Sequence, residues 1–265
     1  MLNSRLLPAT AGRLINGPNT QHFVVLLHAF PLSSTMWDRM ADEFEELRDD
    51  TTFLLIDLPG FGDSPRQPDW TMQRIALPIC QEIRHYTRER VVLGGLSMGG
   101  YAAFAFYSEY PNMLRGLVLS NTKADADTES AKHDREIFAS DALARGSEAA
   151  THRLYSKFVT EETDPEIAID IRTWMDEAHP EAIADALHAM AARPDSTDLL
   201  RLISIPSLVI SGSRDEIIPA ADMRRVAVRL QDAAYVEIKG AAHLTAAERP
   251  KEWAEALGSF LDRIV

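Results

Sequence analysis

Short apolar runs alternate with helical patterns along most of the chain, and this alternation constrains the fold more than any other feature. The runs are rich in valine, leucine and isoleucine, which is typical of strands covered on both faces. Stretches with the periodicity of amphipathic helices separate them. This order predicts a mainly parallel sheet with helices on both faces. The expected strands are 22–28, 51–58, 91–96, 116–120, 207–212 and 235–239, and the expected helices are 35–47, 71–87, 99–110, 220–230 and 250–264.

Between residues 122 and 198 the pattern changes. No strand-like run occurs there, alanine and acidic residues are frequent, and three or four amphipathic helices can be drawn. Pro165 and Pro180 mark two helix starts, because proline is tolerated in the first turn of a helix. We therefore expect a core domain formed by residues 1–121 and 199–265, interrupted by a helical insertion at 122–198.

Composition narrows the class of protein. A chain of 265 residues that is 46% hydrophobic can bury a large core. The formal net charge of −13 argues against a nucleic-acid partner, because no basic stripe is present to displace counterions from phosphates. No apolar stretch is long enough to span a membrane. The leucine pair before Pro8 is too short for the apolar region of a signal peptide. We expect a soluble, cytoplasmic protein with neither a nucleic-acid nor a membrane partner.

Four glycines surround Ser97 in the stretch GGLSMGG at 94–100. In a G-x-S-x-G pattern at a strand-to-helix turn, the serine is held in a strained conformation, and the glycines let strand and helix pack closely. The pattern alone also fits an ordinary tight turn. Here an expected strand ends on it and an expected helix begins on it, which favours Ser97 as a nucleophile.

A serine nucleophile requires a base and an acid that orients the base. A serine hydroxyl is a weak nucleophile at neutral pH, so a histidine must accept its proton. Of the eight histidines, His243 alone lies beyond Ser97 and directly after an expected core strand. Asp215 follows the strand at 207–212, with Glu216 as its rival. We prefer Asp215, because the order Ser97, Asp215, His243 is the one expected for this topology.

Acyl transfer also needs hydrogen-bond donors for the developing oxyanion. One expected donor is the backbone N–H of Met98, directly after the nucleophile. The other is the backbone N–H of Phe30, in the loop that follows the 22–28 strand. His28 starts this loop, and we expect it to have a structural hydrogen-bonding role there rather than to act as a second base.

With these residues placed, the chain resembles the α/β-hydrolase superfamily along nearly its whole length. The resemblance rests on HAFP at 28–31, DLPGFGDS at 57–64, the GLSMG elbow, SGSRDEIIP at 211–219 and GAAHLTAAERP at 240–250. It implies an eight-stranded, mostly parallel sheet, with a helical cap between the sixth and seventh strands that matches 122–198. Within the superfamily, the chain is most similar to capped bacterial carboxylesterases and the 3-oxoadipate enol-lactonase-like group. One departure is Ala29, where the family more often has glycine.

The sequence therefore predicts a hydrolase that cleaves a small-molecule ester or lactone through an acyl-enzyme. No metal or organic cofactor is expected. Two alternatives use the same fold. One is a cofactor-free perhydrolase of the haloperoxidase type, and the other is a receptor-like protein that binds a small ligand with little turnover. Oligomeric state does not follow from the sequence.

The substrate pocket is the least constrained part of the prediction. Aromatic and apolar residues near the oxyanion loop and on the inserted helices are either pocket or packing residues. An anionic lactone would also need a local cation, for which Arg66, Arg153 and His152 are candidates. The candidate pocket residues are Phe30, Leu32, Trp37, Phe138, Phe158 and Trp174.

Overall fold

The computed structural model describes residues 2–9 and 22–264; the remaining residues, including 10–21 of the N-terminal segment considered above, lie outside the description. The described residues form a seven-stranded sheet in the order β1-β3-β2-β4-β5-β6-β7. All neighbouring strands are parallel except β1 and β3. The strands are β1 (Asn3–Leu7), β2 (His22–Leu27), β3 (Thr51–Asp57), β4 (Val91–Leu96), β5 (Leu114–Ser120), β6 (Ser207–Gly212) and β7 (Ala233–Ile238).

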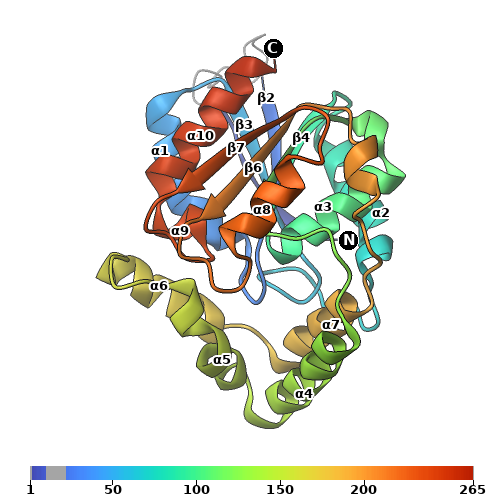
Figure 1. Ribbon diagram of the computed structural model, residues 1–265, viewed down its shortest axis with the longest axis vertical. Helices are drawn as coiled ribbons and strands as arrows, with labels where there is room; N and C mark the ends of the chain where they lie inside the picture. Colours follow the sequence, from blue (N-terminus) through green and yellow to red (C-terminus); the bar gives the residue numbers. More distant parts are fainter. Residues whose placement is uncertain (1, 10–21, 265) are drawn as a thin grey trace.

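Helices cover both faces of the sheet, as the alternating pattern predicts (Figure 1). One face carries α1 (Asp38–Leu47) and α10 (Pro250–Arg263), and the other carries α2 (Met72–Tyr86), α3 (Met98–Glu109) and α8 (Ala220–Ala227). Each expected helix is present within a few residues of its predicted bounds. The shorter helical turns are η2 (Ser34–Trp37), η3 (Pro111–Met113), η4 (Leu199–Leu202) and α9 (Thr245–Glu248).

The strand count differs from the eight that the resemblance implies, since the described residues form seven strands. It also includes β1, which the sequence pattern does not predict. This strand pairs only with β3, antiparallel, from Asn3 opposite Asp57 to Leu7 opposite Phe53. Most of its residues are half-buried, because it lies at the sheet edge. An edge strand of this kind needs no continuous apolar run, which is why the pattern missed it.

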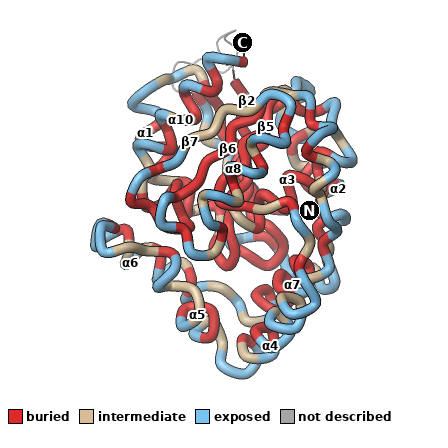
Figure 2. The backbone as a smooth tube through the Cα atoms, in the orientation of Figure 1, coloured by how far each residue is buried: buried red, intermediate tan, exposed pale blue. Residues whose placement is uncertain are grey.

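The central strands are apolar because both of their faces are buried. In β2, Val24 and Leu26 belong to one core cluster with Trp253, whereas Val25 and Leu27 belong to the other with Phe104. Figure 2 shows these strands as buried and most of the surrounding helices as exposed on their outer sides.

Four helices occupy the stretch 122–198. They are α4 (Glu129–Arg145), α5 (Glu148–Phe158), α6 (Pro165–Asp176) and α7 (Pro180–Ala191), and they lie together beyond the carboxyl ends of the parallel strands (Figure 1). The two proline-marked helix starts are confirmed, since α6 and α7 each begin with the proline. Apolar side chains of α4 and α7 join one core cluster, and those of α6 join the other.

Candidate active site

Ser97 stands at the turn between β4 and α3. Its backbone has φ 56° and ψ −112°, a left-handed conformation that a side chain rarely adopts. Its N–H donates to the carbonyl of Ser120 at 2.9 Å, which ties the turn to the end of the neighbouring strand β5. Strained backbone held in place by its surroundings is typical of functional sites.

The two glycines of the pattern allow the close approach around this turn. A Cβ atom on Gly99 would lie 2.1 Å from the carbonyl oxygen of Leu27, and one on Gly95 would lie 2.2 Å from the oxygen of Gly99. Both distances are far inside van der Waals contact. Glycine is therefore required at both positions, because β4, the turn and α3 pack too closely here to leave room for a side chain.

His243 and Asp215 lie in direct contact on the loops that follow β7 and β6. Their side chains are almost completely buried, and His243 Nδ1 lies 2.8 Å from Asp215 Oδ2. The other carboxylate oxygen of Asp215 accepts the backbone N–H groups of Ile217 at 2.8 Å and Ile218 at 2.9 Å. Because the carboxylate can only accept, Nδ1 carries the proton and Nε2 of His243 is left with its lone pair.

Two opposing effects set the pKa of Asp215. Burial raises it, but the charge of His243 and the hydrogen bonds from His243, Asn121 and Ile218 outweigh burial and hold the pKa below its ordinary value. Asp215 is therefore a carboxylate at neutral pH and can stabilise a positive charge that develops on the imidazole.

Asn121 is a site residue that the sequence analysis missed. It directly follows β5, has φ 45°, and donates from Nδ2 to Asp215 Oδ2 at 2.8 Å. Its Oδ1 accepts the hydroxyl groups of Thr245 at 2.7 Å and Ser120 at 2.9 Å. A polar residue at the carboxyl end of a buried parallel strand is a signal that could have found it.

Adjacent strands thus present these groups side by side. Ser97 follows β4, Asn121 follows β5, Asp215 follows β6 and His243 follows β7, and these four strands are consecutive neighbours in the sheet. Parallel strands bring their carboxyl ends to one edge, so residues far apart in the sequence meet there.

The two expected oxyanion donors are free of protein partners. Within the described residues, neither the Met98 nor the Phe30 N–H donates a hydrogen bond to another protein group. Met98 is the first residue of α3, where helix geometry leaves the N–H groups unpaired and the helix dipole favours negative charge. Ala29 keeps a negative φ, so the loop does not need the conformational freedom of glycine there.

His28 has the structural role that the sequence analysis expects. Its Nε2 accepts the N–H of Leu58 at 2.9 Å, and its Nδ1 lies 2.9 Å from the carbonyl of Ala29. The side chain is fully buried, and burial lowers its pKa. With both ring nitrogens engaged, this neutral imidazole anchors the loop at 28–31 to the end of β3.

The structure separates the candidate pocket residues into two groups. The Phe30 ring contacts Phe138 edge to face at 6.0 Å between centroids, and Phe158 stacks on His243. In contrast, Trp37 is completely buried against Trp253, at 5.2 Å between centroids, which favours the packing alternative.

The remaining two candidates are Leu32 and Trp174. Leu32 belongs to the core cluster that contains Trp37. Trp174 lines a separate 280 Å³ cavity with residues 31–35, and Ser97 is not part of its wall.

Of the three candidate cations, Arg153 is the one in contact with these aromatic rings. Its guanidinium lies 4.8 Å above the centre of the Phe138 ring. Arg66 instead pairs with Asp185 at 2.6 Å, and His152 is exposed on α5.

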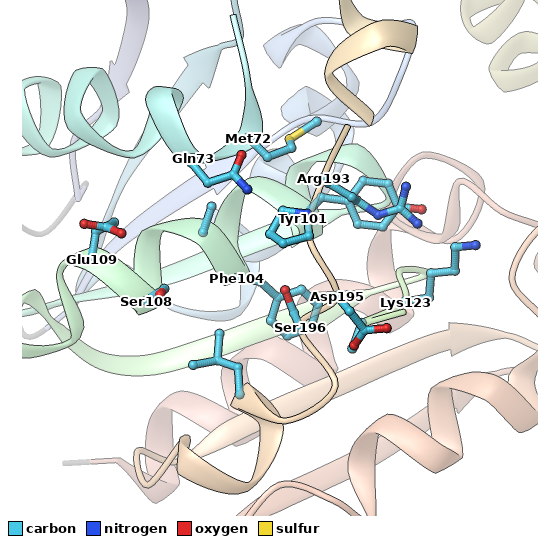
Figure 3. A pocket seen from close by; sticks show the side chains of 14 residues that line it. Met72, Gln73, Tyr101, Phe104, Ser108, Glu109, Lys123, Arg193, Asp195 and Ser196 are labelled. Atoms are coloured by element: carbon cyan, nitrogen blue, oxygen red, sulfur yellow. The ribbon is translucent and has the colours of Figure 1, made fainter. Parts of the chain in front are cut away.

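A second cavity of 260 Å³ lies outside this site, between α3 and the segment 193–199 (Figure 3). Its wall includes Tyr101, over which the guanidinium of Arg193 lies at 4.1 Å. Arg193 also pairs with the buried Asp127 at 2.8 Å. These contacts hold the last residues of the 122–198 stretch against the helix that begins at the elbow.

The described residues include neither a metal-binding cluster nor a membrane-spanning helix. No group of three or more histidine, cysteine or acidic side chains is arranged to hold a metal ion among them. Likewise, none of the helices described has both the length and the apolarity to cross a membrane.

The sheet order, the strained serine turn and the buried aspartate–histidine pair define the α/β-hydrolase class. The chain belongs to the alpha/beta hydrolase family, whose model matches residues 24–256.

Relatives of the chain include esterases and a lactonase. A pimeloyl-[acyl-carrier protein] methyl ester esterase of Chromobacterium violaceum is 25% identical over 90% of this chain and 94% of its own length. The 3-oxoadipate enol-lactonase 1 of Acinetobacter baylyi is 24% identical over 94% of this chain and 92% of its own. A thermophilic esterase from Thermogutta terrifontis, solved with malate bound, is 34% identical with a TM-score of 0.89 and covers 99% of this chain and 93% of its own.

Proposed function

We propose that the protein is a serine hydrolase that cleaves a carboxylic ester or lactone with Ser97 as nucleophile, His243 as base and Asp215 as the acid that orients the base. The observation that carries the proposal is the buried hydrogen bond between His243 and Asp215, at the sheet edge where Ser97 occupies its strained turn. A buried imidazole with one nitrogen held by a carboxylate has its other nitrogen available for proton transfer.

The reaction would proceed in two halves. Ser97 Oγ attacks the acyl carbon while His243 Nε2 accepts its proton, and the resulting imidazolium returns the proton to the leaving alkoxide. In a lactone that alkoxide stays attached to the acyl group. Water, deprotonated by His243, then attacks the acyl carbon. The bond between that carbon and Ser97 Oγ breaks, the imidazolium returns its proton to Oγ, and the carboxylic acid leaves.

The backbone N–H groups of Met98 and Phe30 would stabilise the tetrahedral oxyanion. Removing one such donor typically costs on the order of 100-fold or more in rate. No side chain is needed for this role, so a substitution that keeps the loop conformation should preserve it.

We further propose that 122–198 is a helical cap over the site, with Phe30 and Phe138 forming an apolar wall of the substrate pocket. Three features support this. The four helices lie beyond the carboxyl ends of the strands, Phe138 of α4 contacts Phe30, and Phe158 of α5 contacts His243. The named activities of the relatives fit the same substrate class.

The test measures acid release in a pH-stat across short and long aliphatic esters and a set of lactones. Wild type is compared with Ser97→Ala and with Ser108→Ala, which removes an exposed hydroxyl from the same helix. We expect turnover in wild type and Ser108→Ala and its loss in Ser97→Ala. Equal activity in wild type and Ser97→Ala would exclude the serine mechanism.

Two further assays on the wild-type protein distinguish the alternative functions. A perhydrolase would form peracid from an acetate ester and hydrogen peroxide faster than it hydrolyses the ester. A receptor-like protein would show a raised melting temperature with a lactone or ester ligand and no acid release.

A further inference from the structure

Glu248 is a buried carboxylate that the proposed mechanism does not use. It ends α9, the short helix directly after the His243 loop, and is only 1% exposed. One oxygen accepts the backbone N–H of Ala242 at 2.7 Å, and the other accepts the hydroxyl of Thr163 at 2.7 Å. Within the described residues no cation pairs with it. The adjacent Arg249 lies near a different carboxylate, that of Glu162.

Thr163 belongs to the turn at 159–164, which joins α5 to α6. Its hydroxyl oxygen also accepts the N–H of Thr160 at 2.7 Å, so the group that donates to Glu248 is itself held in place. The Thr160 hydroxyl donates to the carbonyl of Gly240 at 3.2 Å. The turn therefore contacts the chain on both sides of His243, at Gly240 in the histidine loop and at Glu248 in α9.

The same segment reaches the imidazole ring. Phe158 ends α5 and stacks on His243, with 5.7 Å between centroids and 13° between planes. His243 thus has Asp215 at Nδ1, Phe158 on its face, and a backbone fixed through the preceding N–H of Ala242. Each of these contacts limits a different displacement of the ring.

We infer that Glu248 is a positioning residue, which holds the backbone next to His243 against Thr163 of the α5–α6 turn and so keeps the imidazole in place to accept the serine proton. The inference rests on the proposed function, because it takes His243 as the base. It assigns the 122–198 stretch a part in holding the catalytic machinery as well as in covering it.

The cost of burying the Glu248 carboxyl argues against a role in packing alone. Burial raises the pKa of this carboxyl to about 7, although the bonds from Thr163 and Ala242 and the charges of Arg249 and His243 act in the opposite direction. Burying a polar acid without a cation costs stability that an apolar side chain of similar size would not. What the acid provides, and leucine cannot, is an acceptor for two donors from different segments.

The test compares three variants at 25 °C after circular dichroism has shown that each is folded. Glu248→Gln keeps an oxygen for the Ala242 N–H and an amide that can donate to the Thr163 oxygen, so kcat should stay within about threefold of wild type. Glu248→Leu removes both acceptors, and kcat should fall by roughly 100-fold, as expected when a reacting group is displaced by about 1 Å. Thr163→Val removes one of the two donors to Glu248, together with the acceptor for the Thr160 N–H, and should cost about tenfold. KM should change little throughout, because none of these side chains is placed in the pocket.

A second measurement reports the environment of the His243 ring independently of activity. The proton NMR signal of its Nδ1–H, identified by its loss in His243→Ala, should move in Glu248→Leu and return to the wild-type position in Glu248→Gln. An unshifted signal with unchanged kcat in Glu248→Leu would overturn the inference, and if that variant does not fold, the same result in Thr163→Val would do so. Full activity in Ser97→Ala would refute the proposed function instead, and the NMR signal would still decide whether Glu248 positions His243.

Discussion

The ring of Phe158 stacks on the imidazole of His243, with 5.7 Å between the centroids and 13° between the planes. Phe158 ends α5 in the 122–198 stretch, whereas His243 lies 85 residues later, on the loop between β7 and α9. The helical stretch therefore forms one wall around the proposed base. Changes in these helices should affect turnover as well as substrate choice.

Truncation of this wall gives the first prediction. Phe158 is 1% exposed, so Phe158→Ala should lower the free energy of unfolding by about 3–5 kcal/mol, and kcat should fall by roughly tenfold or more because the imidazole loses its packing partner. Phe158→Leu should keep kcat within a few-fold. Denaturant unfolding and steady-state kinetics measure both effects. Phe260→Ala, on α10, is the control, with a comparable loss of stability and an unchanged kcat; an equal loss of kcat in both would contradict the prediction.

Asn121 gives the second prediction. Asn121→Gly suits the left-handed backbone but removes the donor to Asp215, so kcat should fall about tenfold and the acidic limb of its pH profile should move slightly to higher pH. Asn121→Asp places a second carboxylate beside Asp215, and two carboxylates in contact cannot both ionise freely. The acidic limb of the kcat/KM profile should then move to higher pH by about one unit. If the acidic limbs of the kcat/KM profiles coincide for Asn121→Asp and wild type, residue 121 does not affect the ionisation of Asp215.

Most of the architecture can be predicted from the sequence because it depends on local patterns. The strand at 91–96 is recognisable because both of its faces are buried, and Ser97 because two glycines flank it at the strand end. Asp215 and His243 follow from their positions just after two further strands. The strands' carboxyl ends share one edge, so position along the chain is enough to predict proximity in space.

The parts that could not be predicted depend on contacts between distant segments. The bond from Asn121 to Asp215 spans 94 residues, and that from Thr163 to Glu248 spans 85. Neither Asn121 nor Glu248 lies in a motif that demands a particular partner. Likewise, β1 is an edge strand whose pairing with β3 leaves no apolar pattern in the sequence.

Gly99, at the turn that holds Ser97, gives the third prediction, and Gly258 serves as the control. A methyl group on Gly99 would collide with the Leu27 carbonyl, so Gly99→Ala should destabilise the fold by several kcal/mol or prevent folding. Gly258 lies inside α10, where an added Cβ would come no closer than 3.9 Å to its neighbours. Gly258→Ala should therefore raise the free energy of unfolding by about 0.5–1 kcal/mol. Similar melting temperatures for the two variants would contradict this account of the elbow.

The pH dependence of stability gives a prediction for Glu248 that does not depend on catalysis. Burial raises its folded-state pKa to about 7, above the ordinary value of 4.5. Between these values the folded protein holds the proton more tightly than the unfolded chain does. The resulting stabilisation is complete below about pH 4.5 and is lost as the pH rises through about 7, a change on the order of 3 kcal/mol.

The variant Glu248→Gln tests this pH dependence, because glutamine cannot titrate. Its unfolding free energy should fall less than that of wild type between about pH 5 and 8, and the difference should be of the same order, about 3 kcal/mol. Denaturant unfolding across this range measures the difference, and Glu255→Gln, an exposed change on α10, should follow wild type. Parallel curves for Glu248→Gln and wild type would mean that Glu248 titrates alike in the folded and unfolded chains, and that its burial imposes no such cost.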